Sequence, residues 1–577
     1  MSHNLSPLKP EFEPIPGQRT DWGQLYGCSY GLVIKQASER HDGPLVVITP
    51  DTPSATRLEY ELRFFLGERH PCFSFPDWET LPYDNFSPHQ DIISNRLLTL
   101  YRLPELTNGI LIVPVTTLMS RLAPRHYLES NSLMLDTGQT LDIDKMRLRL
   151  EASGYQCVST VYEHGEFAVR GNILDLFPMG NDQPYRIDLF DNEIESIRTF
   201  NPEDQRSIEK VEQIRLLPAR EFPFNKDSIT RFRENYRTRF EGNPQDSIIY
   251  REVSKQIAPP GIEYYLPLFF EQTQTLFDYL PDKSLIITTD DVNQSAELFW
   301  QNISERHEQL SHNVDRPLLK PDEVFLQVNE VLGKINHFPV VRMQRYKRED
   351  ESRATNFATA QPPVLTLDVR AAHPTDPLKN FVDQFHGRVL FAAETQGRRE
   401  TLLEFLRGCD LTPGSFDSWH DFISSESKLG ITVAPLDNGL LINDPAIAVI
   451  AESQLFGEQV MQRRRRKKRQ RETDHIIRNL AELNPGSPVV HEDYGVGRFL
   501  MLQTLKTGDI ETEFLTLEYA DGDKLYVPVS SLHLISRYSG ASPENAPLHK
   551  LGSDHWEKAK RKASEKARDV AAELLEI

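Results

Sequence analysis

The stretch LVVITPDTPSATRLEYEL begins as an apolar strand, breaks at a loop and continues as an amphipathic helix. Its hydrophobic pattern predicts a strand over 44–50 and a helix over 54–66. A second apolar segment, GILIVPV at 109–115, predicts another buried strand, with Thr116 or Thr117 capping the helix after it. Strands that alternate with helices in this way favour a parallel sheet, so the first fold expected is α/β.

The loop between that strand and helix is the place where a nucleotide-dependent enzyme would hold phosphate. Such an enzyme needs a glycine-rich turn, a lysine and a Mg²⁺-binding hydroxyl, in the pattern G-x-x-x-x-G-K-[ST]. Here residues 49–56 read TPDTPSAT; Pro50 and Pro53 lack amide donors, and Asp51 repels phosphate. The strand–loop–helix at 389–406 lacks the pattern too. We therefore expect nucleotide-binding folds without catalytic residues, bound cofactor or metal.

Bulk composition fits a large protein of several domains. The chain has 577 residues, of which 39% are hydrophobic and 26% are charged. No apolar run is long enough for a membrane span, and no signal peptide is evident. The four cysteines (Cys28, Cys72, Cys157 and Cys409) have no ligand spacing, which favours a reducing cytoplasm over a zinc site or disulfides. With a net charge of −20, contact with DNA would require a local basic patch.

The expected architecture is multidomain α/β and α+β. An α/β domain over 1–130 and 216–344 is interrupted by an inserted α+β domain at 131–215. A polar linker at 345–369 leads to a second α/β domain at 370–460. The insertion is expected to hold one helix and then four strands, at 155–162, 167–177, 184–190 and 194–200.

The C-terminal part differs in composition and in its predicted secondary structure. A basic linker at 461–485 contains RRRRKKRQR, which is either a nucleic-acid contact or a solvated segment. Short strands and glycine turns at 486–546 predict a small SH3- or Tudor-like barrel. A helix with an apolar stripe fills 547–577 and has no stop signal. We expect the chain to be the front part of a longer protein; the alternative is a terminal helix packed on its own domain.

One predicted strand carries a candidate binding surface. In 184–190, three apolar residues alternate with Arg186, Asp188 and Phe190, which places Phe190 on the polar face beside Arg186. An exposed aromatic next to an arginine is typical of an interface hot spot, although a stray surface phenylalanine is equally compatible with the pattern. Arg170, on the preceding strand, joins this face if the two strands are neighbours.

Several long strings resemble the bacterial transcription-repair coupling factor family. They are DWETLPYDNFSPHQDIISNRL (77–97), EHGEFAVRGNILDLFPMG (163–180), PYRIDLFDNEIESIRTF (184–200), PVVHEDYGVGR (488–498) and KLYVPVSSLHLISRYSG (524–540). The resemblance extends over essentially the whole chain and is weakest around 302–370 and 410–435.

The resemblance implies a role in transcription-coupled repair. The family is a DNA translocase that recognises RNA polymerase stalled at a lesion, releases it with ATP and recruits excision repair. Its front part resembles the UvrB component of the excinuclease, with a degenerate helicase-like α/β domain. By resemblance, Arg170, Arg186 and Phe190 bind the UvrA component of the excinuclease, and the barrel binds the RNA polymerase β subunit near Leu505.

The motor, with its ATP, Mg²⁺ and most of its DNA binding, is expected beyond residue 577. So is the C-terminal domain that masks the repair-binding face in the family. Two alternatives stay open from the residues. One is an ATP-dependent enzyme with an atypical nucleotide site, and the other is a stand-alone polymerase-binding regulator without a role in repair.

Overall fold

A computed structural model describes the chain in two compact units, one ending at Gln459 and one beginning at Val460. The described residues are 5–10, 19–67, 71–349, 354–367, 375–456, 486–491, 494–507, 510–528, 535–537 and 548–551. The basic run at 463–471 and the predicted C-terminal helix lie outside them. Within these ranges, no helix combines the length and the apolar character that crossing a membrane requires.

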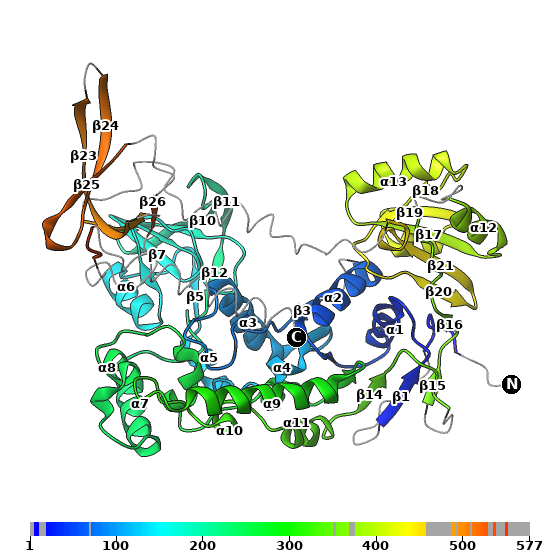
Figure 1. The fold of residues 1–577 in the computed structure, drawn as a ribbon, viewed down its shortest axis with the longest axis horizontal. Coiled ribbons are helices and arrows are strands. Elements are labelled where there is room, and N and C mark those ends of the chain that lie inside the picture. Colours follow the sequence, from blue (N-terminus) through cyan, green and yellow to red (C-terminus); the bar gives the residue numbers. More distant parts are fainter. Residues whose placement is uncertain are drawn as a thin grey trace. The chain divides into compact units, whose positions relative to one another are not determined.

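The first unit is built on a parallel seven-stranded sheet (Figure 1). Its order is β15 (Ala354–Asn356), β1 (Arg19–Gly23), β14 (Val340–Met343), β13 (Leu285–Thr288), β2 (Leu45–Thr49), β4 (Ile110–Pro114) and β3 (Cys72–Ser74). The two strands predicted first, β2 and β4, pair directly and are fully buried. The α/β expectation for this part is confirmed.

The predicted cap at Thr116 or Thr117 is wrong. Helix α4 (Val115–Leu118) already contains both threonines, and Pro114 occupies the N-cap position. The two hydroxyls instead donate to Asp77 Oδ2, at 3.2 and 3.3 Å. The threonines therefore bind a loop carboxylate from outside their own helix.

Helices α1 (Ser29–Ser38) and α2 (Thr52–Leu66) form a layer between two sheets. On one side, residues such as Val33 and Leu62 pack in the core of the seven-stranded sheet. On the other side, Leu32 and Phe65 join the core of a second, six-stranded sheet. Because one helical layer serves both sheets, each sheet stabilises the other.

The second sheet is mixed. Its order is β16 (Thr359–Ala360), β20 (Leu440–Asn443), β21 (Ala446–Ala451), β17 (Arg388–Ala393), β19 (Leu429–Val433) and β18 (Gly414–Ser415). The strands from β21 to β18 pair in parallel, whereas β20 runs antiparallel to both of its neighbours. Helices α12 (Asp376–Gln384) and α13 (Gln396–Gly408) contribute to the core on its other face.

The segment expected to be a linker, 345–369, contains secondary structure. Strand β15 pairs with β1, and β16 pairs with β20, so the segment supplies an edge strand to each sheet. Its polar composition gave no sign of this, because the pairing partner β1 lies more than 300 residues away in the sequence.

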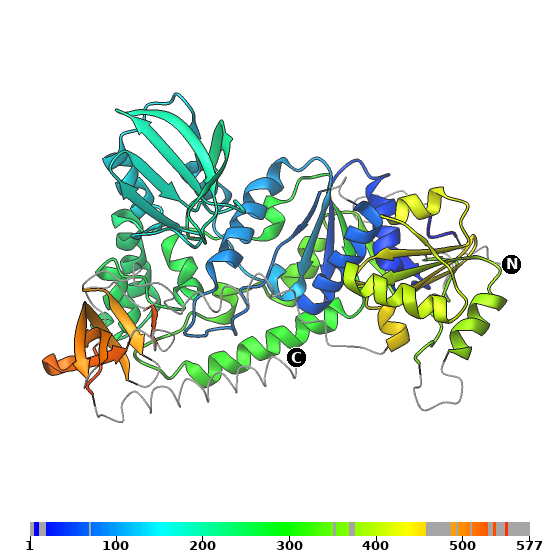
Figure 2. The same ribbon diagram turned by 90° about the horizontal axis from the view of Figure 1, so that it is seen from above.

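The inserted segment forms a six-stranded sheet (Figure 2). Its order is β11 (Ser207–Val211), β10 (Glu193–Phe200), β9 (Tyr185–Phe190), β8 (Ile173–Leu176), β7 (Glu166–Arg170) and β6 (Gln156–Cys157). A separate pair, β5 (Leu133–Asp136) with β12 (Gln213–Leu216), brings the two ends of the insertion together. Helix α6 (Ile143–Ala152) begins at its N-cap Asp142.

The strand predicted over 167–177 is wrong, because it is a hairpin of β7 and β8. Gly171, at φ 60°, forms the turn between them. A left-handed residue is what a tight hairpin turn requires, and glycine adopts that conformation without strain. The hairpin places β7 and β8 side by side, so that Ala168 lies opposite Asp175.

The second unit contains an antiparallel five-stranded sheet. Its order is β25 (Lys524–Pro528), β24 (Ile510–Glu518), β23 (Gly495–Thr507), β22 (Pro488–His491) and β26 (Ile535–Arg537). Leu515, Leu517 and Tyr519, which alternate along the sequence, are all buried in its core. The antiparallel order agrees with the β-rich prediction, although β23 and β24, with 13 and 9 residues, are longer than the short strands expected.

Candidate partner-binding surface

Phe190 lies at the end of β9 with 70% of its surface exposed. The alternation predicted for this strand is confirmed, because Ile187 and Leu189 are buried in the core on the opposite face. A large aromatic side chain with this exposure gains little from the protein's own core. It is therefore available to a partner.

Arg186 lies on the same face and is fixed by a carboxylate. Its Nε and Nη2 donate to the two oxygens of Asp175, at 2.7 and 2.9 Å. Asp175 is only 1% exposed and lies opposite Arg186 in the register of β8 and β9. The guanidinium also lies 5.0 Å over the ring of Phe200. This bidentate pairing raises the pKa of Arg186.

Arg170 joins the same carboxylate more loosely. Its Nη2 lies 3.7 Å from Asp175 Oδ2, and its side chain is 48% exposed. The structure thus brings two of the three predicted residues together, because Arg170 and Arg186 both lie near the carboxylate of Asp175. Phe190 lies on the same face of β9, four residues after Arg186. One guanidinium is held rigidly, and the other is held loosely enough to reach outward.

Asp175 is the residue that the sequence prediction missed. In NILDL, this aspartate interrupts an apolar strand, with Leu174 and Leu176 buried on the other face. A charged residue within such a strand signals a buried partner of opposite charge, since an unpaired carboxylate there is costly. Its partner could not be named without the strand register.

In the loop between β2 and α2, the first candidate nucleotide site, an aspartate accepts a hydrogen bond from an amide at the start of the helix. Asp51 is the N-cap of α2, and its Oδ1 accepts from the amide of Ser54 at 2.7 Å. A nucleotide phosphate would use the amides at this helix terminus. Asp51 occupies that position with a negative charge, which fits the expectation of a fold without nucleotide chemistry.

In the loop between β17 and α13, the second candidate nucleotide site, an arginine forms an ion pair. Arg398, at the start of α13, donates from Nε to Glu452 Oε1 at 2.7 Å. The other oxygen of the buried Glu452 accepts from the amide of Glu394 at 3.1 Å. The arginine that a phosphate could have used is thus held by a carboxylate. In the described part of the chain, no three His, Cys, Asp or Glu side chains gather as metal ligands.

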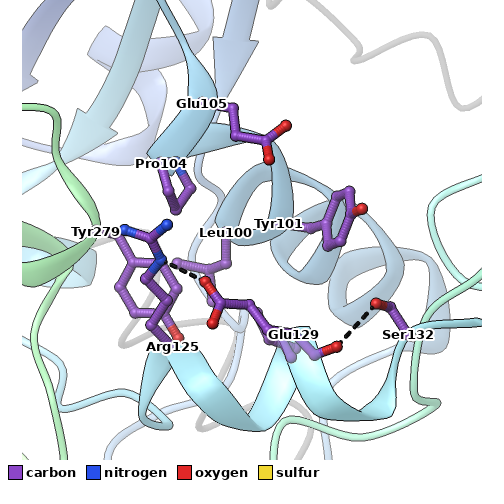
Figure 3. Close-up of a pocket in the computed structure, with 9 residues that line it drawn as sticks. Leu100, Tyr101, Pro104, Glu105, Arg125, Glu129, Ser132 and Tyr279 are labelled. Carbon is purple, nitrogen blue, oxygen red and sulfur yellow. Dashed lines mark hydrogen bonds and ion pairs between the residues drawn. The ribbon is translucent and has the colours of Figure 1, made fainter.

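A cavity of about 150 Å³ lies against α3 (Gln90–Arg102) and α5 (Arg125–Asn131) (Figure 3). Polar groups along its wall bind one another, since Arg125 Nε donates to Glu129 Oε1 at 2.7 Å. The hydroxyl of Ser132 donates to the carbonyl of Glu129. The charges of Arg125 and Glu129 are therefore neutralised within the protein.

Leu505 lies in β23, where its backbone pairs with Thr512 of β24. The two strands form the longest hairpin described in the second unit. The structure thus assigns Leu505 to a strand and leaves its predicted contact with polymerase as a prediction.

Known families match three separate parts of this architecture. The UvrB interaction domain matches residues 133–222, and the MFD D3 domain matches 381–455. The CarD-like/TRCF RID domain matches 483–539. These ranges include the inserted sheet, most of the second α/β sheet, and the antiparallel sheet of the second unit.

Curated relatives match almost all of the chain. The transcription-repair-coupling factor of Haemophilus influenzae is 45% identical over 572 residues, covering 99% of this chain and 50% of the relative. That of Escherichia coli is 44% identical over 562 residues, covering 97% and 49%. The chain belongs to the transcription-repair-coupling factor family. The chain spans about half the length of these curated relatives.

Similarity to transcription-repair-coupling factors extends to more distant species. The factor of Bacillus subtilis is 26% identical over 593 residues, which is 96% of this chain and 48% of the relative. The UvrB interaction domain match contains Arg170, Arg186 and Phe190, and the CarD-like/TRCF RID match contains Leu505. The two predicted binding surfaces therefore fall in two separate domains of the family.

Proposed function

We propose that this chain couples transcription to nucleotide excision repair as an adaptor. One surface binds RNA polymerase stalled at a DNA lesion, and the other recruits the excinuclease component UvrA. The observation that carries this proposal is the exposed Phe190 on the same face of β9 as Arg186, within a segment that matches the UvrB interaction domain. An apolar anchor flanked by an oriented arginine is the composition of a binding hot spot.

The UvrA-binding surface combines a rigid and an adaptable part. Arg186 is fixed on Asp175 and needs no reordering when a partner binds, which lowers the entropic cost of association. Arg170 is half-exposed and reaches its partner by changing rotamer. Phe190 supplies the apolar area that the partner covers.

The polymerase surface lies in the second unit. Its support is the match of residues 483–539 to the CarD-like/TRCF RID domain, together with the antiparallel sheet of β22 to β26. We assign to it a small SH3- or Tudor-like barrel that binds the β subunit through Leu505. Extended strands commonly serve as platforms for partner segments in protein recognition.

ATP hydrolysis and translocation on DNA belong, in this proposal, to the half of the relatives that this chain does not span. Both candidate nucleotide loops are closed by internal contacts, at Asp51 and at Glu452. The chain acts in the cytoplasm, where polymerase and the repair proteins meet, and it contributes binding energy rather than chemistry.

A two-partner binding assay tests this function. Purified chain is immobilised and exposed to UvrA, to core RNA polymerase, and to both together. We expect each protein to bind alone and both to be retained at once. Binding of polymerase without UvrA would instead support a polymerase regulator with no role in repair. Binding of neither would refute the proposal.

A further inference from the structure

Helix α7 (Lys226–Arg239) carries a stripe of side chains without a single acid. Lys226, Thr230, Arg233 and Arg237 follow one another at spacings of four, three and four residues, so they share one face. The helix is anchored to the protein on another face. The buried residues there include Ile229, Phe232 and Tyr236.

Two arginines of this stripe are held by one aromatic ring. The guanidinium carbons of Arg233 and Arg237 lie 5.9 and 5.7 Å from the ring centroid of Tyr250, in α8 (Ile248–Ser254). Arg233 Nε also donates to the Tyr250 hydroxyl at 3.2 Å. Both arginines are exposed and Tyr250 is buried. Two positive groups are thus oriented side by side at the surface.

Neither arginine has a carboxylate partner among the described residues. Their neighbours on the same helix do, since Arg231 pairs with Glu271 at 3.3 Å and Arg239 with Glu323 at 2.9 Å. Arg233 and Arg237 therefore form no ion pair within the described residues, whereas Arg231 and Arg239 do. The nearest acid on the same helix is the exposed Glu234, three residues before Arg237. In a chain with a net charge of −20, such a site stands out.

Helix α8 carries further exposed cations. It packs against α7 (Figure 1), and it presents an exposed Arg251, with an exposed Lys255 directly after its end. Arg251 Nη1 donates to the carbonyl of Gln245 at 3.1 Å, which holds the side chain beside the helix. We call Lys226, Arg233, Arg237 and Arg251 the α7–α8 basic surface.

We propose that the α7–α8 basic surface binds the phosphate backbone of duplex DNA. Arginine matches phosphate with its planar fork of donors, and both central arginines are already oriented by Tyr250. Phosphates present one negative charge after another along each strand, which a ladder of cations on a helix can follow. Contact of this kind is independent of base sequence.

The surface fits DNA better than an acidic protein. Protein interfaces are built around buried aromatic or aliphatic anchors. Among the described residues, none of the large hydrophobic side chains exposed at the surface lies on α7 or α8. A polar surface in which arginines and lysines outnumber acids such as Glu234 and Glu252 has the composition of a phosphate contact.

The test measures binding of the full chain to a short undamaged duplex by fluorescence anisotropy over a range of salt concentrations. For R233Q/R237Q we expect weaker binding and a decrease of about 2 in the slope of log K against log salt, roughly 0.9 for each lost phosphate contact. The matched control is K145Q/R149Q, which removes two exposed cations at the same spacing from α6. The basic run at 463–471 is present in every variant, so its contribution is constant.

A charge-conserving variant separates binding from folding. R233K/R237K keeps both charges and weakens their stacking on Tyr250, so we expect it to retain most of the salt slope. Equal losses in the Lys and Gln variants would show a structural role and overturn the proposal. The proposal is also overturned if K145Q/R149Q lowers the salt slope as much as R233Q/R237Q does. It is overturned as well if R233Q/R237Q leaves the salt slope unchanged. A negative result here would not affect the proposed binding of UvrA, because Arg170, Arg186 and Phe190 lie on strands β7 and β9 and not on these helices.

Discussion

Arg186 and Asp175 lie opposite each other on β9 and β8, and the guanidinium binds both carboxylate oxygens at 2.7 and 2.9 Å. The same arginine belongs to the surface proposed for UvrA. It therefore serves two purposes, because it neutralises a buried charge and belongs to the face proposed for the partner. Its Nη1 donates to the carbonyl of Gln205 at 3.2 Å, so all three nitrogens of the guanidinium are held within the protein. Arg170 and Phe190, the other two residues of that surface, are more exposed and contribute less to the stability of the fold.

Replacing Arg186 should weaken the fold as well as the binding. Arg186→Ala leaves Asp175 buried without its bidentate partner, and we expect the free energy of unfolding to fall by about 3 kcal/mol. Arg170→Ala should cost less than about 1 kcal/mol, because its ion pair is longer and half-exposed. Urea unfolding of the two variants measures both values. Equal losses would mean that Arg170 shares the burden of the buried charge equally.

Phe190→Ala isolates the binding role. Because Phe190 is largely exposed, the free energy of unfolding should change by no more than about 0.5 kcal/mol. Affinity for UvrA should fall by about 2 kcal/mol, roughly thirtyfold. Ile208→Ala is the matched control, since Ile208 is 58% exposed on β11 of the same sheet. Titration calorimetry with each variant decides the matter, and an unchanged affinity for Phe190→Ala would remove it from the surface.

Leu505→Arg should abolish polymerase binding while the second unit stays folded. The backbone pairing of Leu505 with Thr512 does not depend on the side chain, so strand β23 is expected to persist. A polymerase pull-down combined with circular dichroism checks both halves of this expectation. Tyr526→Arg, at an exposed position of strand β25 in the same sheet, serves as the control. Loss of binding in both variants would contradict a contact centred on Leu505.

Glu61 should make the first unit less stable as pH rises. The carboxyl is buried on α2 between the two sheets, and this desolvation raises its pKa from 4.5 to about 8, although Oε2 accepts from the amide of Gly31. Between these two values the unfolded chain has lost the proton that the folded chain keeps. The free energy of unfolding therefore falls over this window by up to about 1.4 kcal/mol per pH unit, and no further above it.

Glu61→Gln should remove that dependence, because the amide cannot ionise. Comparing urea unfolding at pH 6 and pH 8, we expect the variant to lose less stability than the wild type as pH rises. Glu59→Gln on the same helix is the control, since Glu59 lies in an ion pair with Arg63 near the surface. The role of Glu61 would be disproved if the free energy of unfolding of the wild type rose between pH 6 and pH 8 and that of Glu61→Gln rose by the same amount.

Local patterns in the sequence predicted what depends on local geometry. The two-residue period of a strand placed Phe190 on the polar face, and the Asp-Thr-Pro sequence after β2 places Asp51 at the N-cap of α2. What depends on register was missed. The pairing of Asp175 with Arg186 joins two strands, and the strand β15 pairs with a partner far away along the chain. The turn at Gly171 was readable in principle, since the Gly-Asn pair marks a hairpin.

ATP should not stabilise this chain, and this separates an adaptor from an ATP-dependent enzyme. A ligand at 100 times its Kd adds about 2.7 kcal/mol to the free energy of unfolding, which would raise the Tm of a large domain by roughly 5–10 °C. With the amide of Ser54 taken by Asp51, and Arg398 held by Glu452, we expect no change in Tm with millimolar ATP and Mg²⁺. Differential scanning fluorimetry gives the measurement. A rise of several degrees that ATP causes and Mg²⁺ alone does not would favour an atypical nucleotide site over the adaptor.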